Sequence, residues 1–115
     1  MTQNTDQLGH RQRLRSRLIE GGGAALADYE VLEMILFAAR PRGDTKPLAK
    51  TLVRHLGSLG AVLTARPDEL QAIEGVGGGA VGAIAVVSAA TRRLAAAEVL
   101  ERPGLHNWPA RIDFC

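Results

Sequence analysis

Apolar residues recur at intervals of three and four along this chain, and this spacing most limits the folds open to it. Leu48, Leu52 and Leu56 form one such stripe, and Val81 and Ile84 continue the pattern further on. The spacing places side chains on one face of an α-helix, whereas the alternating pattern of a strand is missing. Aromatic residues are only 3% of the 115 residues, so Leu, Val, Ile and Ala must build the core. We predict an all-α fold, a compact bundle of five to six helices.

Proline, glycine and capping residues divide the chain into segments of helical length. A disordered polar tail is expected over residues 1–8 and a helical domain over residues 9–102. Asp28 and Asp44 are expected as N-caps, Pro47 lies in a first helical turn, and Gly57 suits a helix end. The expected helices cover residues 9–20, 28–40, 44–56, 58–65, 66–74 and 78–101.

The helix expected from Asp28 is apolar on almost every side. Its apolar residues are Val31, Leu32, Met34, Ile35, Leu36 and Phe37. Glu30 and Glu33 are its main polar residues, and we interpret them, with Asp28, as acidic residues favoured near a helix N-terminus. Such a helix is either central in the fold or part of a homo-oligomer interface.

Several function classes find no support in the sequence. The single cysteine, Cys115, excludes an internal disulfide and favours a reducing compartment. No uninterrupted apolar run reaches about 18 residues and no apolar leader is visible, so we expect a cytoplasmic protein without membrane contact. His10, His55 and His106 lack metal-ligand spacing, and His10 is interpreted as a helix-start residue. We expect no enzymatic activity and no cofactor in this chain.

A glycine-rich stretch, "AIEGVGGGAVGAI" at residues 72–84, holds five of the 13 glycines. It predicts a short helix, a turn and a second helix, with Gly75 and Gly77 free to adopt positive φ. The first-turn N–H groups of the second helix would lack intrahelical partners and suit a phosphate. The candidate DNA contacts here are Gly75, Val76, Gly77, Gly78, Gly79 and Ala80.

The same hairpin has a second interpretation, in which it only packs two helices together. The spacing of the apolar residues would let the two helices pack together. These residues are Leu70, Ile73, Val81 and Ile84. Glu74 lies beside the turn, where a carboxylate would repel a phosphate, and Ala80 stands where such motifs often have lysine. Phosphate binding and packing alone both remain open at this point.

Basic residues are concentrated in the first part of the chain. Residues 9–66 have ten Lys and Arg against five Asp and Glu, whereas residues 67–115 have four against six. Lys46, Lys50 and Arg54 recur every four residues on the helix face opposite the leucine stripe, and Arg11 and Arg15, like Arg13 and Arg17, are four apart. Arg40, Arg42, Arg92 and Arg93 complete the candidate DNA contacts. A polyanion surface and an ordinary solvated surface are both consistent with this pattern.

Three segments together resemble the N-terminal region of the RadC-like family, bacterial proteins named for DNA repair. They are "GHRQRLRSRLIEGG", "LADYEVLEMILFAARPRGDTKPLAKTLVRHLGSLGAVL" and "IEGVGGGAVGAI", within a resemblance that covers about residues 9–115. The pieces "GHR", "DYE…LE" and "PR-x-DTKPLAK" are specific to that family. The resemblance implies a small all-α domain that contains a helix-hairpin-helix unit.

The last residues are interpreted in the same light. By pattern alone, "NWPARIDFC" at 107–115 is a short helix start, either cut from a longer protein or folded back on the bundle. In the RadC-like family a second, MPN-like domain of the metalloprotease class follows, with a glutamate, an H-x-H pair and an aspartate that bind zinc. The resemblance therefore implies that residues 103–115 are a linker and the truncated start of that missing domain, which alone would hold zinc.

Two functions follow as expectations. The first is a non-enzymatic module that binds double-stranded or branched DNA through phosphates, independently of sequence. The alternative is a protein-interaction or substrate-positioning module for the missing MPN-like domain.

Overall fold

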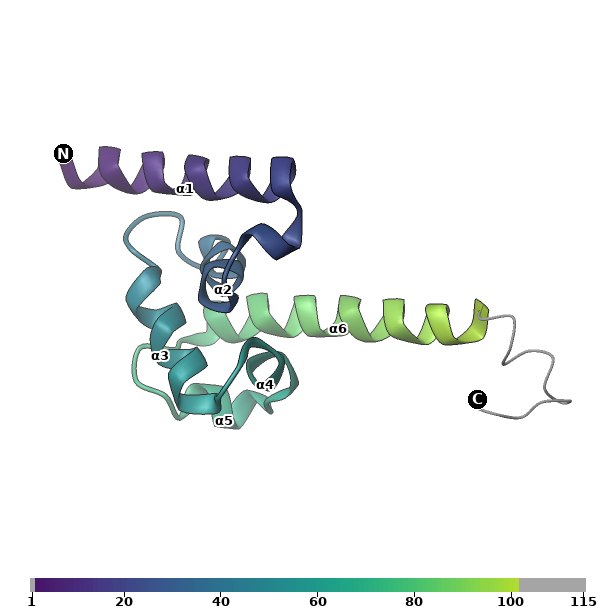
Figure 1. The fold of residues 1–115 in the computed structure, drawn as a ribbon. Helices are drawn as coiled ribbons and strands as arrows, with labels where there is room; N and C mark the ends of the chain where they lie inside the picture. Colours follow the sequence, from purple (N-terminus) through teal and green to yellow (C-terminus); the bar gives the residue numbers. More distant parts are fainter. Residues whose placement is uncertain (1, 102–115) are drawn as a thin grey trace, which may run out of the picture. The chain divides into compact units, whose positions relative to one another are not determined.

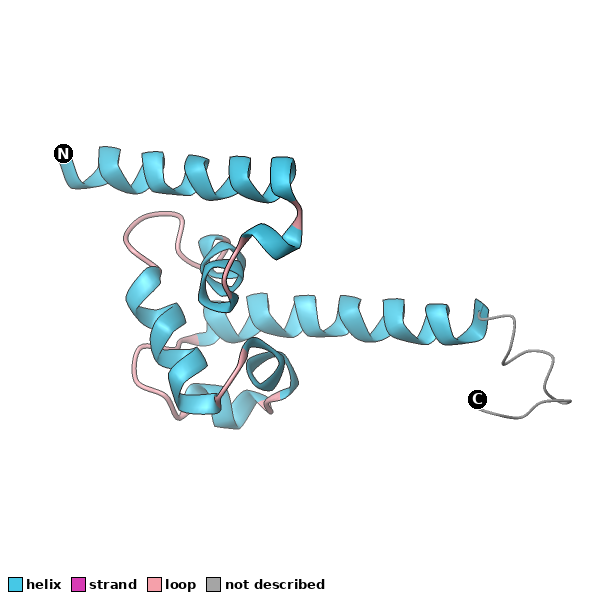
Figure 2. Ribbon diagram, in the orientation of Figure 1, coloured by secondary structure: helices cyan, strands magenta, loops and turns pink. Residues whose placement is uncertain are grey.

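The computed structural model of the chain describes residues 2–101, and this part consists of helices without any strand (Figure 2). The all-α prediction is therefore confirmed. The expectations for residues 103–115 lie outside the described residues. The elements are α1 (Thr2–Gly21), the 3-10 helix η1 (Gly23–Ala25), α2 (Asp28–Phe37), α3 (Lys46–Leu56), α4 (Leu59–Thr64), α5 (Pro67–Gln71) and α6 (Gly78–Glu101).

The chain divides into two units, Met1–Ala85 and Val86–Cys115. The first unit contains α1 to α5 and the first residues of α6. The described part of the second unit is the remainder of α6, and each unit is considered by itself.

Helix α1 extends further toward the N-terminus than the sequence analysis expected. It begins at Thr2, so residues 2–8, expected as a polar tail, are helical. The segment before Gly9 contains neither proline nor glycine, and a helix propagates easily once its first turn has formed. Its C-terminal end at Gly21 falls in the predicted glycine run.

Helix α2 is the centre of the first unit, where α1, α3 and α4 contact it (Figure 1). Its Leu32 and Leu36 side chains are fully buried. Leu52 of α3 and Val62 of α4 are also fully buried in the same cluster. Of the two explanations for this apolar helix, the structure supports a central position in the core.

The N-terminus of α2 corrects one capping assignment. Ala27, not Asp28, occupies the N-cap position, and the backbone N–H of Ala27 donates to Glu30 Oε1 at 2.9 Å. The Asp28 carboxylate instead accepts from the backbone N–H of Leu59, the first residue of α4, at 3.3 Å. Capping rules assign Asp28 to the N-terminus of α2, but in the structure Asp28 binds the N-terminus of α4.

Helix α6 is unusually apolar for its length. By length and composition alone, its residues Gly78–Leu100 could cross a membrane, with a mean hydropathy of 1.4. The sequence analysis expected no membrane contact because it found no uninterrupted apolar run, whereas length and mean hydropathy allow a few charged residues within the helix. The adjacent Arg92 and Arg93 interrupt the apolar sequence.

Candidate nucleic-acid interface

The glycine-rich stretch forms a turn between α5 and α6. Gly75 has a φ of 94°, in the left-handed region that favours glycine, as predicted. The prediction was wrong for Gly77, which does not have a positive φ. Gly77 instead directly precedes α6, and its carbonyl accepts the backbone N–H of Val81 at 3.1 Å. That role requires no left-handed backbone.

The apolar residues of this stretch belong to the core of the first unit. Leu70, Ile73 and Ile84 are buried, and Val76 and Val81 are partly buried against the same core. Both helices therefore share the apolar cluster of the first unit.

The first turn of α6 presents backbone N–H groups that have no partner within the helix. Gly77, Gly78 and Gly79 are exposed, whereas the Ala80 side chain is only 5% exposed. A Cβ built at Gly79 would lie 3.6 Å from Ala39 Cβ, so the end of α2 adjoins this turn. Glu74, the nearby carboxylate, is exposed as well.

Arg40 connects the basic loop after α2 to the hairpin. Its Nη2 donates to the Gly75 carbonyl at 2.9 Å, although 35 residues separate the two positions. Arg40 remains exposed, as does Arg42 in the same loop. The structure thus brings together two candidate elements that the sequence left separate, the basic loop and the glycine turn.

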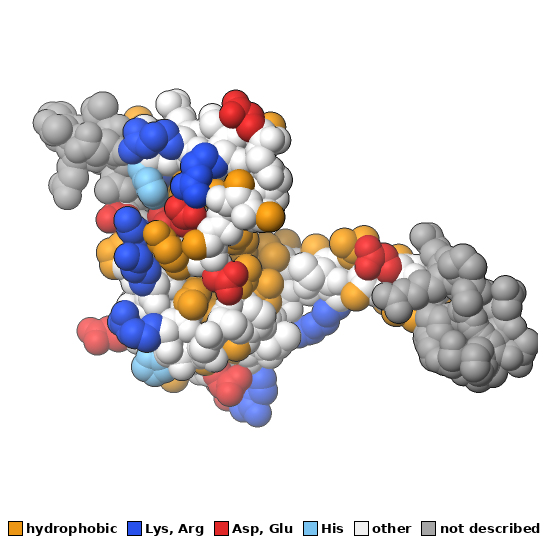
Figure 3. All heavy atoms as spheres, viewed as in Figure 1, with side chains coloured by type: hydrophobic (Ala, Val, Ile, Leu, Met, Phe, Trp, Pro, Cys, Tyr) orange, Lys and Arg blue, Asp and Glu red, His pale blue; other side chains and the backbone are white. Residues whose placement is uncertain are grey.

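The cations of α3 lie on a different face from the hairpin. A Cβ at Gly75 would be 3.5 Å from Leu48 Cδ1, so the turn packs on the leucine side of α3. Lys46 and Lys50 are each two residues from Leu48, which places them about 200° around the helix. Figure 3 shows Lys and Arg side chains over α3 on the left of the view, with acidic side chains among them.

The Lys50 ammonium lies 5.0 Å from the centroid of the Tyr29 ring, and both Lys50 and Arg54 are exposed. Lys46 is partly buried, and its backbone N–H donates to Asp44 Oδ1 at 3.0 Å. Asp44 therefore binds the first turn of α3, but its assignment as the N-cap was wrong, because Thr45 holds that position. Arg92 and Arg93 are exposed in the second unit.

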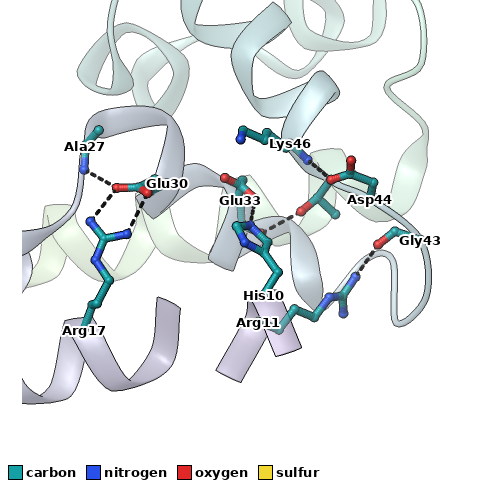
Figure 4. Close-up of polar contacts among 10 residues, drawn as sticks. His10, Arg11, Arg17, Ala27, Glu30, Glu33, Gly43, Asp44 and Lys46 are labelled. Atoms are coloured by element: carbon teal, nitrogen blue, oxygen red, sulfur yellow. Dashed lines mark hydrogen bonds and ion pairs between the residues drawn. The ribbon is translucent and has the colours of Figure 1, made fainter. Parts of the chain in front are cut away.

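Two arginines of α1 do not form the free basic stripe that the sequence pattern predicts. Arg17 donates two hydrogen bonds to the Glu30 carboxylate, at 2.9 and 3.1 Å (Figure 4). It donates a third to the Ala25 carbonyl at 2.9 Å. The Arg17 guanidinium lowers the pKa of Glu30, helped by the Ala27 N–H, and this pairing raises the pKa of Arg17. Arg13 remains exposed.

Arg11 is buried against the loop that follows α2. Its side chain donates to the carbonyls of Arg40, Pro41 and Gly43, at 2.6, 3.1 and 3.0 Å. Its Cζ lies 4.2 Å from the centroid of the Phe37 ring. The residue therefore binds backbone acceptors of its own chain instead of facing solvent.

His10 and Glu33 form a contact that the sequence analysis missed. Glu33, expected as a polar residue favoured by the helix dipole, is completely buried, and His10 Nε2 lies 2.8 Å from its Oε1. Glu33 Oε2 is also buried and has no hydrogen-bond partner within the described part. The Glu33 backbone carbonyl accepts from Thr45 Oγ1 at 3.4 Å. His10 therefore joins α1 to α2, and its interpretation as a helix-start residue was wrong, because α1 begins eight residues earlier at Thr2.

Metal ligands do not gather in the described part of the chain. Residues 2–101 contain no group of three or more His, Cys, Asp or Glu side chains that could hold a metal ion. The candidate interface instead contains exposed backbone amides and the Arg40 guanidinium, and both kinds of group can bind phosphate.

The chain is similar to curated proteins of one bacterial family. A UPF0758 protein of Rhodobacter capsulatus is 49% identical over 102 residues, covering 89% of this chain and 48% of the relative. A UPF0758 protein of Ruegeria pomeroyi is 42% identical over 106 residues, covering 92% of this chain and 47% of the relative. The chain thus spans about half the length of these relatives.

Both relatives are named UPF0758 proteins, so the chain is similar to proteins of the RadC-like family that the sequence motifs resemble. No family model matches the chain, and no solved structure matches it.

Proposed function

We propose that this chain is a non-enzymatic module of a RadC-like DNA repair protein that binds DNA phosphates without reading base sequence. The hydrogen bond from Arg40 to the Gly75 carbonyl carries this proposal, because it holds an exposed guanidinium beside the turn that precedes α6. A guanidinium has five N–H donors, and this bond uses one of them. Together with the free amides of Gly78 and Gly79, Arg40 offers a phosphate several donors at once.

In this proposal α5, the turn and α6 act as a helix-hairpin-helix unit, and double-stranded or branched DNA is the partner. Arg42 adds charge in the same loop. The exposed cations of α3 supply a second phosphate contact on another face of that helix. Such contacts are independent of sequence and weaken steeply as salt rises.

Titration of a fluorescent duplex with the chain, at low and moderate salt, tests the proposal. We expect micromolar binding at about 50 mM salt and a large loss of affinity by about 200 mM. No binding at the lower salt concentration would overturn it.

Two variants separate the α3 cations from the hairpin. We expect Lys46→Glu combined with Lys50→Glu to weaken binding more than Gly77→Val does, because it reverses two charges. Gly77→Val should keep the fold, since a Cβ there meets nothing within 4 Å and its φ is not positive. An equal or larger loss from Gly77→Val would assign the main contact to the hairpin. As a control of opposite sign, Glu74→Gln should strengthen binding, because it removes a carboxylate beside the turn.

A protein-interaction or substrate-positioning role is the second candidate, supported by the apolar side chains on α6. Val86, Leu94 and Leu100 are 69%, 60% and 67% exposed. The partner in this case is the MPN-like domain that the family resemblance implies, or a second copy of this chain. We expect calorimetry with the MPN-like domain of a UPF0758 relative, and light scattering of the chain alone, to detect such contacts. No heat of binding, together with a monomer, would remove this candidate.

The leading proposal also places the chain in the cytoplasm, without membrane contact, and assigns it neither catalysis nor a cofactor. Zinc chemistry would belong to the MPN-like domain. Arg92 and Arg93 support the absence of membrane contact, since one arginine at the centre of a spanning helix costs about 2.5–3.5 kcal/mol.

A further inference from the structure

Arg11 gathers three backbone acceptors of one loop around a single guanidinium. The carbonyls of Arg40, Pro41 and Gly43 all accept from it, and the Arg11 side chain is nearly enclosed, at 9% exposure. The loop over residues 38–45 contains no helix or strand, and the four residues at its centre, Arg40 to Gly43, are all exposed. Its shape therefore depends strongly on this one side chain.

The chemistry of arginine suits this task better than that of any other residue. Its planar fork directs several donors in fixed directions, and its flat face packs on the Phe37 ring at 4.2 Å. Gly43 has a φ of 90°, so the loop turns sharply where its carbonyl meets Arg11. Lysine lacks both the planar fork and the stacking face.

The same contacts reach the hairpin through Arg40. Arg11 binds the Arg40 carbonyl, and the Arg40 side chain binds the Gly75 carbonyl. We infer that Arg11 is a positioning residue, which fixes the 40–43 segment so that the Arg40 guanidinium stays beside the hairpin turn. The inference deepens the proposed function, on which its DNA readout rests, whereas its effect on the loop does not depend on DNA.

Hydrogen exchange of the loop tests the positioning role directly. In Arg11→Gln we expect the amides of Ala39 and Arg40, which donate to the Leu36 carbonyl at 3.0 and 2.9 Å, to exchange about tenfold to a hundredfold faster, because the charge-assisted bonds that hold their segment are lost. The matched control is Arg15→Gln, which removes the same charge from an exposed position of α1 and should leave loop exchange unchanged. Loop exchange in Arg11→Gln equal to the unmodified chain would overturn the inference.

The salt dependence of DNA binding gives a second readout that general destabilisation would not move. If Arg11→Gln releases both Arg40 and Arg42, the slope of log affinity against log salt should fall by about 2, against about 1 or less for Arg15→Gln. Arg11→Lys keeps the charge but lacks the fork, so it should behave like Arg11→Gln. Full rescue by Arg11→Lys, or equal slopes for the two Gln variants, would contradict the inference.

The design separates the two levels of the proposal. If the unmodified chain binds no DNA while Arg11→Gln still loosens the loop, the proposed function fails and the positioning role stands. If Arg11→Gln loses its helical circular dichroism, Phe37→Leu provides the exchange test, because it removes the stacking face and keeps an apolar side chain. We expect about threefold faster loop exchange in Phe37→Leu, and unchanged exchange there would contradict the inference.

Discussion

Helices α1 and α3 both carry frequent cations, yet the structure uses these cations differently. On α1, Arg11 is buried against backbone carbonyls and Arg17 is paired with Glu30. On α3, Lys50 and Arg54 are exposed and form no ion pair within the described residues. Similar basic patterns can therefore bind groups of the same chain in one helix and form an exposed charged surface in another.

The difference follows from what each helix offers the core. The leucines of α3, such as Leu48 and Leu52, are buried, so its cations stay outside. The side of α1 that faces α2 has Leu14 as its fully buried apolar residue and meets the carboxylates of Glu30 and Glu33. Basic side chains complete that contact, because a buried carboxylate requires a hydrogen-bond partner.

The largest expected effect that sharpens this comparison comes from Glu33. We expect Glu33→Ala to lower the free energy of unfolding by about 3 kcal/mol, since it leaves a cavity and removes the buried partner of His10. Urea denaturation followed by circular dichroism measures this loss. Glu74→Ala, at an exposed position, should change stability by less than about 0.5 kcal/mol. Equal effects would show that α1 is not held by its polar contacts.

A smaller effect is expected from the arginines themselves. Arg17→Ala should move the urea midpoint to a lower concentration, because Arg17 has three hydrogen bonds, although it remains about half exposed. Arg54→Ala should cost less than about 0.5 kcal/mol, since no partner for Arg54 exists among the described residues. The same urea denaturation experiment compares the two variants. A loss of stability in Arg54→Ala equal to that in Arg17→Ala would contradict the difference between α1 and α3.

The smallest effect concerns pH. The pKa of Glu30 is lowered from 4.5 by Arg17, so its stabilising contribution is present above pH 4.5 and is lost as pH falls through the lowered value. Unfolding free energies measured from pH 6 to about 3 should fall less steeply in Glu30→Gln than in the unmodified chain. Asp68→Asn is the control: the pKa of Asp68 is also lowered, by Arg66, but that pair is exposed and screened. A larger change in Asp68→Asn would contradict the special role of the α1 contact.

Local rules were sufficient for much of the fold. The spacing of apolar residues predicted the helices and the burial of Leu32 and Leu36, and glycine predicted the left-handed turn at Gly75. They failed at Asp28, which accepts from the first backbone N–H of α4, and at Gly77, whose place before α6 requires no positive φ. In the candidate site, sequence identified the glycine turn and the basic loop but not the bond that joins them.

The missed contacts share one physical cause. His10 and Glu33 are 23 residues apart, and Arg11 binds carbonyls 29 to 32 residues away. One signal for them did exist: the segments "GHR", "DYE…LE" and "PR-x-DTKPLAK", which carry the family resemblance, contain these residues. Their joint presence marked them as special without showing that they touch.

The sequence by itself determined the helical class, the approximate positions of most helices and the apolar faces, because these depend on the 3.6-residue period and on local backbone preferences. Only the tertiary structure decided which cations remain exposed, which one binds a loop, and where the Arg40 guanidinium lies. Those outcomes depend on partners brought together by the burial of Leu14, Leu32 and their neighbours, and a local pattern contains no information about distant partners.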